Sequence, residues 1–137
     1  MGLDNGIRIK GVTPAAQHWL LEYADVEKFE MVEGGIDIAY WRKYFNVRSK
    51  IQEHIKGFKV GDDTPLTFAD LVTICHICEK FITKEYSWDE NRGCLWDWVH
   101  GVKNLAQIII DIQDFIDEVE EMGFDENEFE IYFYDSF

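Results

Sequence analysis

The sequence predicts an α+β domain in which helices pack on a small, mostly antiparallel sheet. Three observations carry this prediction: short stretches of alternating apolar residues, longer stretches with apolar residues three or four apart, and a Gly-Gly pair between two alternating stretches. The chain has 137 residues, which suits a single domain over residues 1–137. Hydrophobic residues make up 47% of the chain, which excludes an extended disordered protein.

Alternation of apolar and polar residues predicts the strands, near 6–10, 28–33, 36–41 and 129–134. The second and third should form a hairpin, because Gly34-Gly35 between them can adopt the positive φ angles of a tight turn. Residues 59–65 are polar and rich in turn formers, and we expect a loop there.

Helical spacing predicts about four helices, near 14–24, 46–56, 68–84 and 96–122. Thr13 followed by Pro14 is typical of a helix start, and Thr67 with Asp70 resembles a capping box. Gly123 can take the left-handed conformation that ends the last helix.

The last helix has the clearest apolar stripe, predicted to consist of Val102, Leu105, Ile109, Ile112, Ile116 and Val119. Carboxylates should then fall on the opposite side. The last turn carries Glu118, Glu120 and Glu121, which oppose the helix dipole. A helix selected for stability alone would favour Lys at these positions.

Charge is the strongest compositional signal. The formal net charge is −14, and residues 104–137 contain eleven acidic residues and no Lys or Arg. The phosphates of a nucleic acid would be repelled by this negative charge, so we do not expect direct nucleic-acid binding. A partner protein with a basic surface is favoured instead. The alternative interpretation is a solvated face that only keeps the protein soluble. The candidate partner-binding residues are Asp111, Asp114, Asp117, Glu118, Glu121, Asp125, Glu126 and Glu128.

A second candidate site is Tyr40-Trp41-Arg42-Lys43, between a predicted strand and a predicted helix, together with Arg48. Aromatic rings beside cations suit stacking of a base and pairing of a phosphate, so this region could bind a nucleotide-like anion. The alternative is that the two aromatic residues pack in the core and the cations lie over them.

Thiols and imidazoles at Cys75, Cys78, Cys94 and His100 provide ligand types that zinc accepts. The first two lie inside a predicted helix, on its apolar face, so buried thiols are the favoured interpretation. No nucleophile motif, phosphate-binding loop or dinucleotide fingerprint occurs. We therefore expect no cofactor and favour a non-enzymatic protein over an enzyme such as a phosphate-ester hydrolase. No apolar run reaches the length of a membrane span, and the N-terminus lacks the pattern of a signal peptide.

Three segments carry a resemblance: Met1-Gly2-Leu3-Asp4, then Tyr40-Trp41-Arg42-Lys43 leading into a helix, and the terminal aromatic strand from Tyr132 to Phe137. In these segments, the chain resembles a family of small uncharacterised proteins of bacteriophages and prophages. The resemblance rests on about a dozen residues and on their order along the chain. Members follow the second element with Ala-Asn-Ala-Ile-His, whereas this chain has Tyr44-Phe45-Asn46-Val47-Arg48. The resemblance therefore implies a phage setting and no catalytic residue.

In that setting, we expect a non-enzymatic accessory protein that acts in the cytoplasm of the bacterial host. It would bind and antagonise a host factor, such as a defence nuclease, through its acidic C-terminal surface. A small-molecule binder that uses the Tyr40-Trp41-Arg42-Lys43 region for a nucleotide-like anion is the alternative. The oligomeric state is left open.

Overall fold

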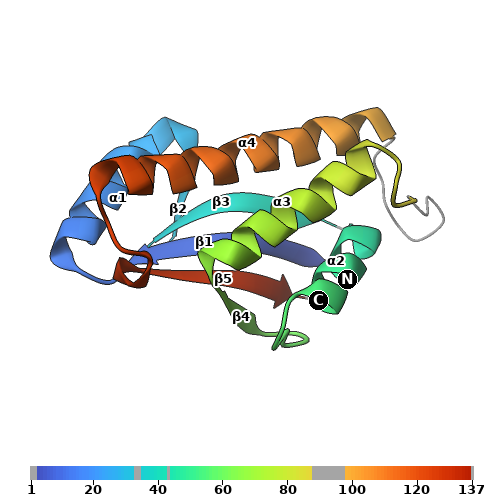
Figure 1. Cartoon of the computed structure of the whole chain (residues 1–137), viewed down its shortest axis with the longest axis horizontal. Coiled ribbons are helices and arrows are strands. Elements are labelled where there is room, and N and C mark those ends of the chain that lie inside the picture. The colour runs from blue at the N-terminus through green and yellow to red at the C-terminus, as the bar shows by residue number, and fades with distance from the viewer. Residues whose placement is uncertain (1–2, 33–34, 43, 88–97, 137) are drawn as a thin grey trace.

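The computed structural model describes residues 3–32, 35–42, 44–87 and 98–136. Within these residues, a five-stranded antiparallel sheet has the order β2-β3-β1-β5-β4 (Figure 1). The strands are β1 (Asp4–Gly11), β2 (Glu30–Val32), β3 (Gly35–Arg42), β4 (Asp63–Leu66) and β5 (Phe129–Ser136). Since β1 pairs with both β3 and β5, the first and last strands of the chain are neighbours. The N- and C-terminal ends therefore lie at the same end of the sheet (Figure 1).

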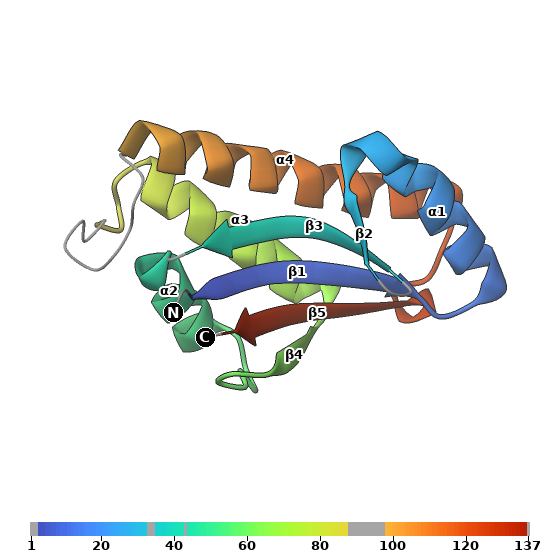
Figure 2. The ribbon, with the colours of Figure 1, turned by 180° about the vertical axis from the view of Figure 1, so that it is seen from behind.

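The helices lie on one side of this sheet. They are α1 (Pro14–Lys28), α2 (Phe45–His54), α3 (Phe68–Ile82) and α4 (Trp98–Met122). α3 and α4 pack on each other and cross one face of the sheet, while the strands are nearest the viewer when the molecule is seen from behind (Figure 2). The predicted α+β class, with its antiparallel sheet, is confirmed.

The expected helix ends are also confirmed. Thr13 accepts a hydrogen bond from the backbone N–H of Ala16 at the start of α1. Thr67 and Asp70 form a reciprocal capping box at the start of α3. Gly123 has a φ of +77°, and the chain turns there out of α4. These local signals depend on few neighbouring residues, which is why the sequence alone reveals them.

The loop predicted for residues 59–65 is wrong at its end, where β4 pairs with β5. Thr64 and Leu66 are buried, while Asp63 and Pro65 between them are exposed, so the segment has the alternation of a half-buried strand. Proline is tolerated because β4 is an edge strand and its outer side needs no donor. Of the expected hairpin turn, Gly35 begins β3 and Gly34 lies outside the described residues.

The apolar stripe of α4 is rotated from the predicted one. Ile108 and Phe115 are fully buried, whereas Ile109 and Ile116 are only partly buried. The rotation follows from an aromatic cluster in which the ring of Phe115 contacts Trp19, with centroids 6.1 Å apart. As a result, the acidic side chains of α4 start at the flank of the helix, next to its buried stripe, and are not confined to the side opposite the core.

Tyrosine and arginine side chains cover part of the sheet face that has no helices. The ring of Tyr134 on β5 lies over Gly6 of β1, where a Cβ atom would collide with it. Its hydroxyl donates a 2.9 Å hydrogen bond to Asp37 on β3. The guanidinium of Arg8 lies 4.6 Å from the centre of the same ring. One side chain therefore spans three strands, and this explains why glycine stands at position 6.

Candidate functional site

Three carboxylates gather on the flank of α4 that faces α1. The hydroxyl of Tyr23 on α1 donates a 2.7 Å hydrogen bond to Asp114. Burial raises the pKa of Tyr23 well above its ordinary value, and the nearby carboxylates of Asp114, Asp111 and Glu118 raise it further. The structure thus brings three of the predicted partner-binding residues to one place.

Two more of the predicted residues, Asp117 and Glu121, are exposed on the outer side of α4. Among the residues that the structure describes, neither forms an ion pair with Lys or Arg. Ile110 lies one and two helical turns before Asp114 and Asp117, and its side chain is 58% exposed. We call Asp111, Asp114, Asp117, Glu118 and Glu121 the α4 acidic face. It combines negative charge with one exposed apolar side chain.

The remaining predicted residues lie in the turn before β5, in a short 3-10 helix (Glu126–Glu128) and its cap Asp125. Glu126 accepts a 2.5 Å hydrogen bond from the backbone N–H of Phe68, the first residue of α3. Glu128 accepts hydrogen bonds from the hydroxyl of Thr13 and from the backbone N–H of Asp125. Two of these three carboxylates therefore stabilise the chain's own helix starts.

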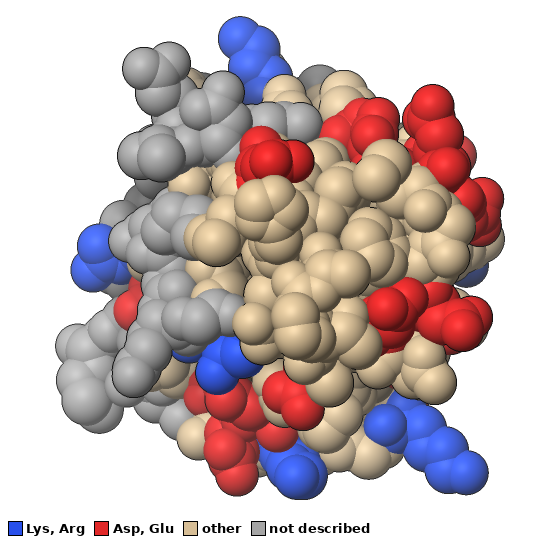
Figure 3. Space-filling view, turned by 90° about the vertical axis from the view of Figure 1, so that its left-hand side faces the viewer, with Lys and Arg blue, Asp and Glu red and all other residues tan. Residues whose placement is uncertain are grey.

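The acidic side chains do not form one continuous patch at the end of the molecule where α1 and the end of α4 lie. Figure 3 shows them there at several separate places, with neutral surface between them. The candidate surface is therefore the α4 acidic face alone, and not the whole acidic C-terminal segment.

Asp135 is an acidic residue that the sequence analysis did not place. Its side chain is fully buried, and Arg48 of α2 donates to both of its oxygens at 2.7 Å. Asn5 of β1 and the backbone N–H of Gly61 donate to it as well. Burial of the carboxyl opposes ionisation, but these hydrogen bonds outweigh it and hold the pKa of Asp135 below its ordinary value. The pair ties β1, β5 and α2 together.

The alternative anion site does not assemble as predicted. Trp41 is 1% exposed and packs against Phe133 in the core. Arg48 is held by Asp135, and Lys43 lies outside the described residues. Tyr40 and Arg42 remain, and both lie beside Asp4 of β1, to which Tyr40 donates a 2.6 Å hydrogen bond. Alternation along β3 sends Trp41 to the opposite face from these two neighbours.

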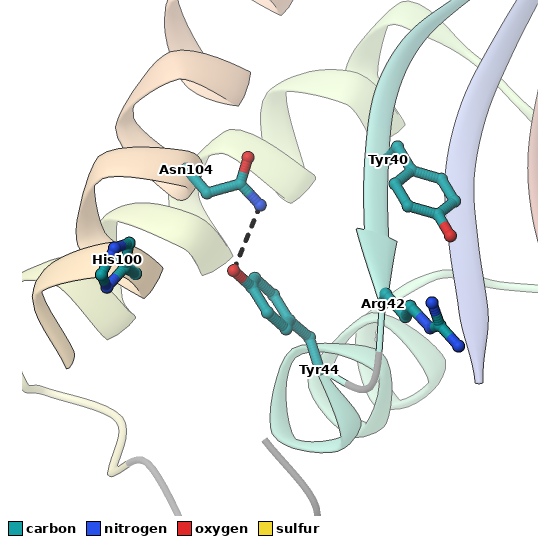
Figure 4. Close-up of a pocket in the computed structure, with 5 residues that line it drawn as sticks. All are labelled: Tyr40, Arg42, Tyr44, His100 and Asn104. Carbon is teal, nitrogen blue, oxygen red and sulfur yellow. Dashed lines mark hydrogen bonds between the residues drawn. The ribbon is translucent and has the colours of Figure 1, made fainter. Parts of the chain in front are cut away.

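Tyr40 and Arg42 instead line a hollow of about 280 Å³, together with Tyr44, His100 and Asn104. The amide of Asn104 on α4 donates a 3.2 Å hydrogen bond to the hydroxyl of Tyr44, which bridges α4 and the start of α2 (Figure 4). Figure 4 also shows that Tyr40 and Arg42 project from β3 away from α4. The sequence analysis missed Tyr44 and Asn104, since no local motif distinguishes them.

The cysteines of the zinc hypothesis are buried in α3. Burial raises the pKa of the Cys75 thiol to about 11, with a contribution from Glu79, and raises that of Cys78 further. His100 is exposed on α4, and Cys94 lies outside the described residues. Within the described residues, no group of three or more His, Cys, Asp or Glu side chains could hold a metal ion. In the same part of the chain, no helix is both long and apolar enough to cross a membrane.

Comparisons of this chain with protein-family models, with curated proteins and with solved structures found no match.

Proposed function

We propose that this chain is a non-enzymatic binding protein that docks a basic surface of a partner protein on the α4 acidic face. The observation that carries the proposal is the placement of five carboxylates on that face, which belongs to a segment, residues 104–137, whose sequence contains no Lys or Arg. A basic groove on the partner would complement this charge, speed association and make binding sensitive to salt. The exposed side chain of Ile110 adds an apolar contact among the charges.

The end of α4 supports the proposal in a second way. Its last turn contains acidic residues and no basic one. Negative charge at a helix C-terminus opposes the helix dipole, at about 0.3–1 kcal/mol for a single charge. Residues that weaken the helix and make no ion pair with a described Lys or Arg are better explained by an external contact than by folding.

The resemblance to phage proteins suggests the partner class. We propose a factor of the bacterial host, such as a defence nuclease whose nucleic-acid groove is basic, in the host cytoplasm. The protein would occupy that groove and block it.

The test is a pull-down from bacterial lysate at low and high salt, with a matched pair of variants. The first variant reverses three charges of the α4 acidic face, two of them exposed and that of Glu118 half-buried: Asp117→Lys, Glu118→Lys and Glu121→Lys. The control reverses three exposed carboxylates on α2, α3 and the segment after α3, with the same change of net charge: Glu53→Lys, Glu79→Lys and Glu85→Lys.

We expect the wild-type chain and the control to retain the same partner at low salt and to release it at high salt. The variant of the α4 acidic face should lose the partner at both. If that variant retains the partner as well as the control does, the α4 acidic face is not the docking site and the proposal fails.

A second candidate function is binding of a small anion in the hollow beside Tyr40 and Arg42, which is favoured by the volume and lining of that hollow. In that case Arg42→Ala should abolish a thermal shift produced by a panel of nucleotides, and the variant of the α4 acidic face should keep it. Absence of any shift with the panel removes this candidate.

A further inference from the structure

The outer edge of β3 is only partly paired. β2 pairs with Gly35, Ile36 and Asp37, but β3 continues to Arg42. In the described part of the chain, no strand lies beside Ile38–Arg42 on the side away from β1 (Figure 2). An unpaired strand edge presents backbone N–H and C=O groups to which another strand can add.

The direction of the backbone groups along this edge follows from the contact with β1. The carbonyl oxygen of Ala39 lies against Gly6 of β1. Because the backbone groups of successive strand residues point to opposite sides, those of Tyr40 point away from β1, and those of Arg42 do the same. Hydrogen-bonding groups therefore face outward at this edge.

A groove follows the same edge. A hollow of about 360 Å³ is lined by four consecutive residues of β3, from Asp37 to Tyr40. The register of β3 against β1 shifts between Asp37 and Ala39, so Ile38 has no partner on β1 and the alternation of side chains is interrupted there. Four consecutive residues therefore line one hollow along the edge of the strand. One wall of the groove is thus the free edge of β3.

The other wall is α4. Its lining residues are Asn104, Gln107, Ile108 and Asp111, which follow the spacing of a single helix flank. Tyr40 and Asn104 also line the 280 Å³ hollow, so the two hollows adjoin and the groove continues toward Arg42. We call this feature the β3–α4 groove. A strand edge facing a helix across a groove is an arrangement that accepts an extended peptide.

Charge along the groove selects the peptide. The carboxylate of Asp111 lies at one end, the amides of Asn104 and Gln107 are in the middle, and Arg42 lies at the other end. Asp37 also lies at the first end, but its carboxylate accepts the hydrogen bond from the Tyr134 hydroxyl on the sheet face without helices. Beyond Asp111, the carboxylates continue along α4 with Asp114 and Glu118. A peptide with Lys or Arg at the carboxylate end complements this pattern. A second copy of the chain is a poor occupant, because each copy carries a net charge of −14.

We propose that an extended segment of the partner protein adds to β3 as a further strand beside Ile38–Arg42, and that a basic side chain of this segment lies beside Asp111, where the α4 acidic face begins. This inference rests on the proposed function and says how the partner is bound. The β3–α4 groove supplies backbone hydrogen bonds, and the α4 acidic face holds the basic residues that follow.

The test begins with a displayed library of random peptides of about twelve residues, long enough for one strand and its flanks. The library is selected on the full-length chain, and the recovered peptides are synthesised with a fluorophore as the probes. We expect these peptides to be enriched in Lys or Arg on one side of a stretch of β-forming residues. Failure to recover peptides of this composition overturns the inference.

A matched pair of substitutions on α4 tests the location. Gln107→Trp fills the β3–α4 groove, whereas Gln113→Trp places the same ring on an exposed residue outside it. Both positions are exposed, so both variants should fold. We expect Gln107→Trp to weaken peptide binding by about tenfold or more, and Gln113→Trp to change it by less than about twofold. Equal effects of the two variants overturn the inference.

The peptide backbone tests the mode of binding. If the peptide is an added strand, alternate amides of it bond to β3. N-methylation of one alternate set should abolish binding, and N-methylation of the intervening set should leave it intact. An identical response of both sets contradicts strand addition. A dimer of the free chain that Gln107→Trp dissociates would assign the groove to a second copy and also overturn the inference.

The inference and the proposed function fail in distinguishable ways. If Gln107→Trp retains the lysate partner and the charge reversal of the α4 acidic face loses it, the proposed function stands and the groove inference falls. If the charge reversal retains the partner and Gln107→Trp loses it, the acidic docking surface falls and the groove remains.

Discussion

Asp135 and Asp117 carry the same carboxylate and lie in the same acidic C-terminal segment, yet the fold uses them in opposite ways. Asp135 is buried, and four donor groups from Asn5, Arg48 and Gly61 surround its oxygens. Asp117 is exposed on α4 and has no Lys or Arg partner among the described residues. Charge counted along a sequence therefore does not separate carboxylates that hold a fold from those that remain for a partner. Substitutions at each kind of carboxylate test that separation.

The Arg48–Asp135 pair should produce the largest effect. Asp135→Asn keeps the shape of the side chain but leaves the guanidinium of Arg48 without a buried counter-charge. Breaking a buried ion pair from one side destabilises a protein by about 3–5 kcal/mol. We expect a loss of this size in the free energy of unfolding, measured by urea denaturation, for Asp135→Asn and for Arg48→Met.

The double variant is the control, because it removes both charges. It should lose less than the sum of the two single variants, since no unpaired charge remains. Additive losses would mean that the two side chains are not coupled, and Asp135 would then belong with the exposed carboxylates.

The same pair gives the stability a defined dependence on pH. The folded-state pKa of Asp135 is lowered, so its contribution is complete above the ordinary pKa of an Asp, at about pH 4, and is lost as the pH falls toward the folded pKa. The difference in unfolding free energy between the wild-type chain and Asp135→Asn should therefore shrink below about pH 4. Urea denaturation at a series of pH values measures it, and a difference that stays constant down to the lowest pH contradicts the assignment.

The carboxylates that accept hydrogen bonds at helix starts should have intermediate effects. Glu128→Ala removes the acceptor of the Thr13 hydroxyl and of the backbone N–H of Asp125. Glu126→Ala removes the acceptor of the first backbone N–H of α3. Each should reduce the unfolding free energy by about 1 kcal/mol, as the loss of a capping interaction does.

Asn127→Ala, between these two residues in the same exposed turn, is the matched control for the capping variants. Thermal denaturation compares the three. If the two Glu variants are as stable as the control, these carboxylates do not contribute to the fold and return to the set that is available for a partner.

Local signals explain how much of the fold could be predicted. The starts of α1 and α3 depend on residues three apart, and the sequence displays them directly. β4 was missed because Asp63 and Pro65 disfavour a strand and Thr64 alone favours one, so the pairing with β5 decides its structure. The stripe of α4 was misplaced because Phe115 is drawn inward by rings from α1 and β5, which are distant in sequence.

The candidate site shows the same difference between local signals and contacts of residues that are distant in sequence. Asp135 was missed because the predicted strand ends at residue 134, whereas β5 continues its alternation to bury Asp135, and its partner Arg48 is 87 residues away in the chain. The acidic residues of α4 could be found by composition. The groove could not, because it depends on β2 pairing with only the first three residues of β3. Whether a strand edge is free depends on how many residues of the two strands pair. The sequence does not show that number when both strands of a hairpin have alternating residues.

The smallest change in stability is expected from the charge reversal of the α4 acidic face, and its sign is the informative part. Asp117→Lys, Glu118→Lys and Glu121→Lys place positive charges in the last two turns of α4, where they favour the helix dipole instead of opposing it. The variant should gain up to about 1 kcal/mol in unfolding free energy at low salt, while it loses the partner in the pull-down. The control reversal at Glu53, Glu79 and Glu85 should retain the partner. It is a control for binding only, because Glu53 and Glu79 lie near the C-terminal ends of α2 and α3 and Glu53 pairs with Lys50. A carboxylate whose removal stabilises the fold and abolishes binding is held by selection for the partner. A loss of stability in this variant would instead place these residues beside Asp135, among those the fold itself requires.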